Sequence, residues 1–210
     1  MKRLENAEMR DAILDSVISC KIAADGSEVS LSQISCGAGV SERTVNRYFP
    51  DKDMMVFTAA ARYLKRRYDA FAAKFRAVDV GGMNGLERIL LLLRLQADAN
   101  RSSMPAARTF IRAYITVLRT AIYRKIKAPT YDAEVKKIVA ECIKIGKADG
   151  SIGVSVPSET VYTLLSSSYM GLLQQYIYSC TAAASEDGDY EKAELNPDAF
   201  IAGIKKSLAP

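Results

Sequence analysis

The sequence predicts an all-α protein. Apolar residues recur at helical spacing along almost the whole chain, and no stretch has the alternating pattern of a strand. Segments that contain glycine or proline divide this pattern into pieces of helix length. With 210 residues, of which 49% are hydrophobic and 25% charged, the chain can bury a substantial core in one or two domains.

The N-terminal part predicts three helices, over about residues 10–24, 30–38 and 41–49. Ser30-Leu31-Ser32-Gln33 has the pattern of a capping box and opens the second helix. Gly39 can adopt the left-handed backbone that ends this helix, and Ser41 can cap the third through its hydroxyl. Pro50 ends the third helix early, because it cannot donate a backbone hydrogen bond and biases Phe49 away from helical geometry.

The second and third helices together predict a helix-turn-helix. A helix of about two turns is not stable alone in water, so neighbouring helices must hold the third one in place. Its exposed face is expected to carry hydrogen-bonding side chains, which are those of Glu42, Arg43, Thr44, Asn46 and Arg47. Such a set on a short, well-anchored helix suits the major groove of DNA. The alternative is a helix-turn-helix whose surface only packs or is solvated.

Several residues of this region resemble the signature of TetR-type transcriptional regulators. They are Ile34-Ser35-Cys36-Gly37-Ala38-Gly39-Val40-Ser41, Arg43-Thr44, Tyr48-Phe49 and Lys52, and the resemblance is close over roughly residues 10–58. It implies a helix-turn-helix DNA-binding domain over 1–52, joined by a long helix to a helical ligand-binding and dimerisation domain over 53–210. Ser35, Gly37 and Asn46 depart from the family's pattern, and Asn46 stands where the family usually has an aromatic residue.

The DNA contacts can be assigned by role. Arg43 lies near the start of the third helix, where a long side chain can bond a guanine edge bidentately. Lys52 opens the following helix, where free backbone N–H groups and the helix dipole favour a phosphate. Thr44 and Tyr48 resemble the family's backbone-contacting positions. The expected DNA-binding residues are Ser32, Glu42, Arg43, Thr44, Asn46, Arg47, Tyr48 and Lys52.

The rest of the chain predicts further helices over about 52–78, 86–99, 104–127, 131–149, 158–182 and 196–208. The first is a long rod that ends at a glycine-rich joint over 80–85. The helix over 86–99 is apolar almost all round, which is typical of a central helix. On the helix over 104–127, the expected inner stripe is Ile111, Tyr114, Ile115, Leu118 and Ile122, and the expected outer face includes Thr109.

Aromatic and methionine side chains gather on the helices over 104–127 and 158–182. Together with the helix over 86–99, they are expected to enclose an apolar pocket of a few hundred Å³ with hydroxyls for orientation, which suits a flat or amphipathic effector. The alternative is that each aromatic simply fills the core. The expected ligand-binding residues are Phe110, Tyr114, Leu118, Tyr169, Met170 and Tyr176.

The last two helices predict a homodimer. Ser166, Ser167, Ser168 and Gly171 are small residues that would let another helix approach closely. The helix over 196–208 has an apolar face of its own. The expected interface residues are Leu165, Leu172, Ile201 and Ile204.

Composition argues against an enzyme. The chain has no histidine, which removes the commonest general base and metal ligand, and it has no phosphate-cradling glycine loop or nucleophile elbow. We therefore expect no catalytic residue, metal or cofactor. The four cysteines, Cys20, Cys36, Cys142 and Cys180, are too widely spaced for a zinc motif and are expected to be buried free thiols. The longest apolar run, 89–93, is far shorter than the ~20 residues of a membrane span, and the expected location is cytoplasmic.

These observations favour a ligand-responsive DNA-binding regulator, a dimeric repressor released from a pseudo-palindromic double-stranded operator by a small molecule. Two half-sites lie about 34 Å apart, so a ligand that favours one domain arrangement would change the fit of the two recognition helices. The alternative is a similar helical dimer that acts through another protein without specific DNA binding. The net charge of +5 favours anionic partners only slightly.

Overall fold

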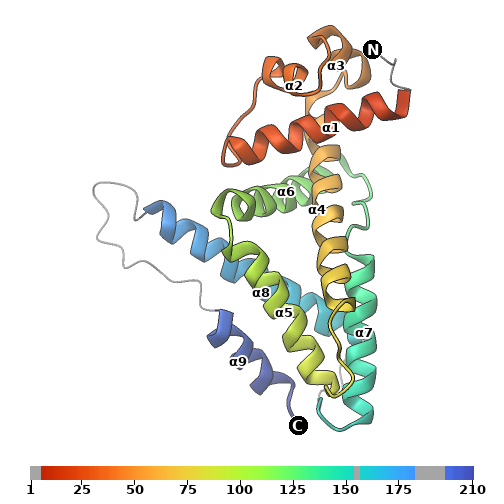
Figure 1. Ribbon diagram of the computed structural model, residues 1–210, viewed down its shortest axis with the longest axis vertical. Coiled ribbons are helices and arrows are strands. Elements are labelled where there is room, and N and C mark those ends of the chain that lie inside the picture. Colours follow the sequence, from red (N-terminus) through yellow and green to blue (C-terminus); the bar gives the residue numbers. More distant parts are fainter. Residues whose placement is uncertain (1–5, 154–156, 183–196) are drawn as a thin grey trace. The chain divides into compact units, whose positions relative to one another are not determined.

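The computed structural model describes residues 6–153, 157–182 and 197–210, and all regular secondary structure in that part of the chain is helical (Figure 1). The all-α prediction is therefore confirmed for these residues. The helices are α1 (Asn6–Ala23), α2 (Leu31–Gly37), α3 (Glu42–Tyr48), α4 (Lys52–Arg76), α5 (Gly85–Arg101), α6 (Met104–Arg124), α7 (Ala133–Ala148), α8 (Ser158–Ala182) and α9 (Pro197–Leu208).

The helices gather in two compact units. Unit 1 comprises residues up to 66 and 104–131, which include α1, α2, α3, α6 and the first part of α4. Unit 2 comprises residues 67–103 and those from 132 onward. Helix α4 is continuous and contributes residues to both units. The functional division expected after residue 52 remains a prediction, whereas the packing unit of the three N-terminal helices also includes α6.

The predicted helix ends of unit 1 are present. Ser30 and Gln33 form the capping box of α2, in which Ser30 Oγ accepts from Gln33 N at 3.2 Å. Gly39 has a φ of +66°, the left-handed value expected at the end of α2. Ser41 Oγ accepts from Thr44 N at 3.2 Å at the start of α3. The helix-turn-helix therefore folds through local signals that are readable in the sequence.

Gly37, which departs from the TetR-type pattern, allows α2 to lie close to α1. A Cβ atom added at Gly37 would lie 2.4 Å from Ser16 Oγ, which is far inside a normal contact. The Ser16 hydroxyl is buried and donates to the carbonyl oxygen of Ile34 in α2 at 2.8 Å. The glycine and the serine thus form a matched pair, because the hydrogen bond needs the space that a side chain at Gly37 would fill.

The inward face of α6 agrees only in part with the predicted one. Ile115, Leu118 and Ile122 are 44%, 37% and 77% exposed, and Thr109, expected on the outer face, is buried. The residues that α6 buries are mostly small, and they are Ala107, Thr109, Phe110, Ile111, Ala113, Val117 and Ala121. Helix α6 packs on α1, and small side chains permit that approach. The prediction was right for Ile111, which is buried, and wrong for Ile115, Leu118 and Ile122, because it ranked the faces by hydrophobicity.

Unit 2 is built around α5, which packs on both α7 and α9, while α7 also packs on α8. The expectation of a central helix here is confirmed. At the start of α5 the two backbones come very close, since a Cβ atom added at Gly85 would lie 2.3 Å from the Cα of Gly146 in α7. Cys142 is buried in this unit, and burial raises the pKa of its thiol to about 11.

The thiols differ in exposure. Cys20 is half-buried and Cys36 is exposed, so the expectation of buried thiols is wrong for Cys36. The side chain of Cys180 lies outside the described residues.

Candidate DNA-binding surface and effector cavity

Helix α3 is anchored by one face and presents the other. Val45 is completely buried, and Phe49, directly after the helix, is 6% exposed. Glu42, Arg43, Asn46 and Arg47 are all exposed on the opposite side. The predicted arrangement of a short rod with a polar outer face is therefore what the structure contains.

The C-terminal end of α3 is tied to the start of α1. The Tyr48 hydroxyl donates to Asn6 Oδ1 at 2.9 Å. The guanidinium of Arg47 lies over the Tyr48 ring, 5.3 Å from its centroid, and that of Arg10 lies over the Phe49 ring at 5.0 Å. Sequence reasoning missed Asn6, for which the only signal was a polar residue near the start of a helix.

Lys52 is exposed at the start of α4, as expected. The preceding Asp51 caps α4 by accepting from Met54 N at 3.0 Å. The same carboxylate pairs with Arg124 of α6 at 2.6 Å, and the hydrogen bond from Arg124 is the main cause that lowers the pKa of Asp51. Arg124 also reaches Asp53 at 3.2 Å. The start of α4 is thus fixed by α6, which the sequence did not indicate.

Ser32 on α2 is exposed, and Thr44 and Tyr48 are half-buried. All the residues expected to contact DNA belong to unit 1, and none of them is buried. This arrangement leaves each of them available to an external partner.

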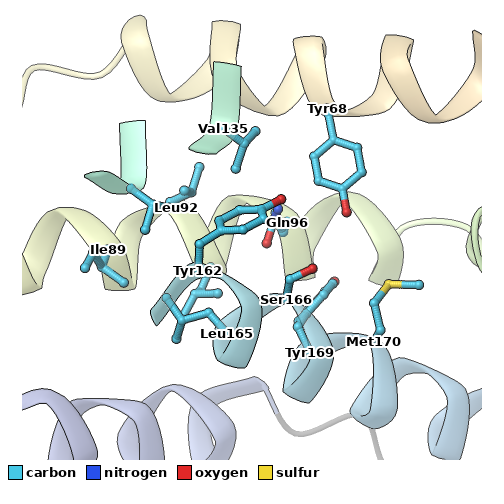
Figure 2. A pocket seen from close by; sticks show the side chains of 12 residues that line it. Tyr68, Ile89, Leu92, Gln96, Val135, Tyr162, Leu165, Ser166, Tyr169 and Met170 are labelled. Atoms are coloured by element: carbon cyan, nitrogen blue, oxygen red, sulfur yellow. The ribbon is translucent and has the colours of Figure 1, made fainter. Parts of the chain in front are cut away.

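Unit 2 contains a small cavity between α4, α5, α7 and α8 (Figure 2). Tyr68, Tyr162 and Tyr169 contribute aromatic side chains to it, and Gln96 and Ser166 contribute polar groups. Its volume is about 20 Å³, which is enough for about one water molecule. The expected cavity of a few hundred Å³ is therefore not open, and α6 takes no part in its lining.

A polar network lies at one side of this cavity. The amide nitrogen Nδ2 of Asn100 and the Tyr169 hydroxyl lie 2.7 Å apart, and Arg67 Nη2 donates to Asn100 Oδ1 at 2.9 Å. Asn100 is 1% exposed. Burial raises the pKa of Tyr169 to about 12, so its hydroxyl stays protonated at neutral pH. On α8, Tyr162 donates to Asp132 Oδ2 at 2.8 Å.

The expected ligand-binding residues are divided between the two units. Tyr169 and Met170 line the cavity, and Tyr176 is half-buried elsewhere on α8. Phe110, Tyr114 and Leu118 belong to unit 1, where Phe110 is a core residue that is 1% exposed. Tyr68, Gln96 and Ser166 were missed, and their only signal was a polar atom among apolar neighbours on a helix.

The expected interface residues also divide. Leu165 and Ile201 are buried within unit 2, and Leu165 lines the cavity. Leu172 and Ile204 are half-buried. The outward face of α8 instead carries Leu164 and Tyr178, which are 60% and 65% exposed, with small residues between them.

The all-helical fold with its N-terminal helix-turn-helix is similar to that of TetR-type transcription regulators. No protein-family model and no curated protein sequence matches the chain. Several solved structures do match the chain. The fatty acid degradation regulator FadR from Bacillus halodurans is 13% identical with a TM-score of 0.64, and the match covers 99% of this chain and 97% of that one.

Two further structures show the same similarity. A transcriptional regulator of the TetR family from Agrobacterium tumefaciens is 14% identical with a TM-score of 0.61, covering 98% of this chain and 100% of that one. A transcriptional regulator from Saccharomonospora viridis, solved in complex with choline, is 19% identical with a TM-score of 0.67 and the same coverage, 98% and 100%.

These similarities establish the fold. The chain has the all-helical fold of TetR-family transcription regulators, and the resemblance inferred from its N-terminal residues is confirmed at that level. The structures that it resembles are transcription regulators rather than enzymes. Among the described residues, no helix is both long and apolar enough to span a membrane.

Proposed function

We propose that the protein is a dimeric, ligand-responsive regulator that binds a pseudo-palindromic DNA operator through α2, α3 and the start of α4. The observation that carries this proposal is α3 itself. Its Val45 side is fully buried, and its opposite side presents exposed Arg43, Asn46 and Arg47. A short helix with its backbone fixed by a core can place side chains on base edges without a large ordering cost.

The experiment for this proposal is a selection of bound sequences from random duplex DNA with the purified protein. An enriched sequence with two inverted half-sites about one helical turn apart, or a small multiple of that, supports it. Recovery of no preferred sequence, together with retention of a protein partner, would instead favour a helical dimer that acts without specific DNA binding.

The homodimer proposal rests on the outward faces of α8 and α9. Gly171 and Gly203 both stand within helices, where glycine costs stability, and a Cβ atom at either would meet nothing within 4 Å. Neither glycine is needed for packing inside the described protomer. A partner helix that lies against this face would account for both, and would also cover the exposed Leu164 and Tyr178.

The effector proposal rests on the cavity of unit 2. Tyrosine rings and polar groups from three helices converge there, as in a ligand site, but the space holds only about 20 Å³. Effector binding would therefore favour a less populated state in which the cavity is wider. Because α4 contributes residues to this cavity and to unit 1, we propose that the change reaches the helix-turn-helix through α4 and releases the DNA.

A further inference from the structure

Unit 1 contains two hollows that are much larger than the cavity of unit 2. Two adjoining hollows of about 510 and 550 Å³ open between α1, α4 and α6. We call them together the basic groove, and the residues that line both are Val17, Lys21, Glu28, Val56, Thr116 and Arg119. Each volume is in the range of sites that hold small organic molecules.

The groove has an apolar floor. Val17 and Ala59, both 2% exposed, lie at its base. Ile115 and Tyr123 of α6 also line it and are 44% and 87% exposed, a large exposure for apolar side chains. A molecule with an apolar body would remove these surfaces from water.

The charges of the groove are mostly positive. Five basic side chains line it, from Lys21, Lys52, Arg112, Arg119 and Arg124, against the two carboxylates of Glu28 and Asp53. Asp53 is already paired with Arg124. Within the described residues, no carboxylate forms an ion pair with Arg119 or Lys52.

Lys21 shows that this crowding has an electrostatic effect. Burial lowers the pKa of Lys21 below its ordinary value, Glu28 opposes that shift, and Arg112 and Lys52 add to it. The buried hydroxyl of Thr109, on the α6 side of the groove, has no hydrogen-bond partner within the described part of the chain. The groove therefore contains both cations and a hydroxyl that an anionic, hydrogen-bonding ligand would satisfy.

We propose that the basic groove is a second ligand site, which binds a small amphipathic anion with its apolar body against Val17 and Val56 and its charged group beside Arg119. A carboxylate and a phosphate share this chemistry. Glu28 lies two residues before the cap of α2, and Lys52 is an expected DNA contact, so the anion and DNA phosphate would oppose each other's binding. By linkage, each would weaken the other by the same factor.

The test uses the full chain and 8-anilinonaphthalene-1-sulfonate, an apolar ring system with one anionic group that fluoresces when it leaves water. We expect saturable binding that Arg119→Gln weakens by about tenfold or more, as for loss of one charged hydrogen bond. Arg119→Lys should retain most of the affinity. Arg94→Gln, which removes an exposed arginine from α5, is the matched control and should bind like the wild type.

Displacement of the probe identifies the anion chemistry. Decanoate and decyl phosphate should displace the probe, and the more effective of the two identifies the preferred anionic group. Decanol, which has no charge, should bind more weakly by about tenfold or more. Equal displacement by decanol would overturn the proposal, because the groove would then not recognise charge.

A second pair of variants separates the two sites. Thr116→Trp fills the groove, and Ser166→Trp fills the cavity of unit 2. If Ser166→Trp abolishes probe binding while Arg119→Gln and Thr116→Trp do not change it, the anion binds in unit 2 and the proposal fails. Circular dichroism verifies folding, and Arg119→Gln carries the test if Thr116→Trp does not fold. None of these measurements uses DNA, so the result is independent of the proposed operator binding.

Discussion

At the scale of single residues, the clearest relation between sequence and structure is the pair of Ser16 and Gly37. Gly37 is an unfavourable residue for α2, because glycine is a poor helix former. A contact with α1 explains this glycine. The Ser16 hydroxyl occupies the space beside Gly37 when it donates to the Ile34 carbonyl oxygen. A single sequence shows the glycine but not its neighbour, so this departure could not be explained before the structure.

A double-mutant cycle tests this pair. Gly37→Ala should lower the free energy of unfolding by about 1–3 kcal/mol, because the new methyl group would overlap with Ser16 Oγ. In a Ser16→Ala background, the same change should be close to neutral or should stabilise by up to about 1 kcal/mol, through helix propensity. Urea unfolding measures both. An equal cost in the two backgrounds would show that the overlap with Ser16 is not the cause.

At the scale of elements, helix existence could be predicted and helix orientation could not. Capping residues and the glycine with positive φ set the ends of α2 and α3, since those signals are local. The inward faces of α6 and α8 depend on which neighbour each helix meets. Leu164 and Leu165 are equally apolar, yet one is 60% exposed and the other lines a cavity. A single sequence therefore could not show which of the candidate ligand and interface residues face inward.

A matched pair of substitutions on α6 tests its orientation. Val117→Ala should lower the free energy of unfolding by roughly 1–3 kcal/mol, because Val117 is completely buried. Ile122→Ala should change it by no more than about 0.5 kcal/mol, because Ile122 is 77% exposed. Thermal and chemical unfolding of the two variants decide the matter. A larger loss of unfolding free energy for Ile122→Ala than for Val117→Ala would show that α6 buries the face that hydrophobicity predicts.

At the scale of the whole molecule, the proposed operator binding requires two protomers, because an operator with two half-sites needs two copies of α3. The helical glycines of α8 and α9 and the exposed Leu164 and Tyr178 all lie where a second protomer would explain them. The fold itself followed from the N-terminal residues, whereas a partner surface could not be assigned from the sequence, since a dimer interface and a core helix are both apolar.

Gly171→Leu tests the proposed interface. In an isolated protomer the change should be tolerated, since open space surrounds the site and leucine is the better helix former. In a dimer it should block the close approach of the partner helix and raise the dissociation constant by about tenfold or more. Lys144→Leu, at an exposed position on α7, is the control. Sedimentation velocity that shows the same dimer for both variants, or a monomeric wild type, would contradict the proposed interface.

The central claim is that α3 reads the operator bases and that the start of α4 contacts only the DNA phosphates. A salt-dependent binding titration of two variants tests this claim. Arg43→Ala should cost about 1–3 kcal/mol on the selected operator and relax the preference at one base pair. Lys52→Ala should weaken selected and scrambled DNA alike and reduce the salt slope by about one unit. If Arg43→Ala leaves the ratio of selected to scrambled affinity unchanged, α3 does not read the bases through Arg43 and the central claim is wrong.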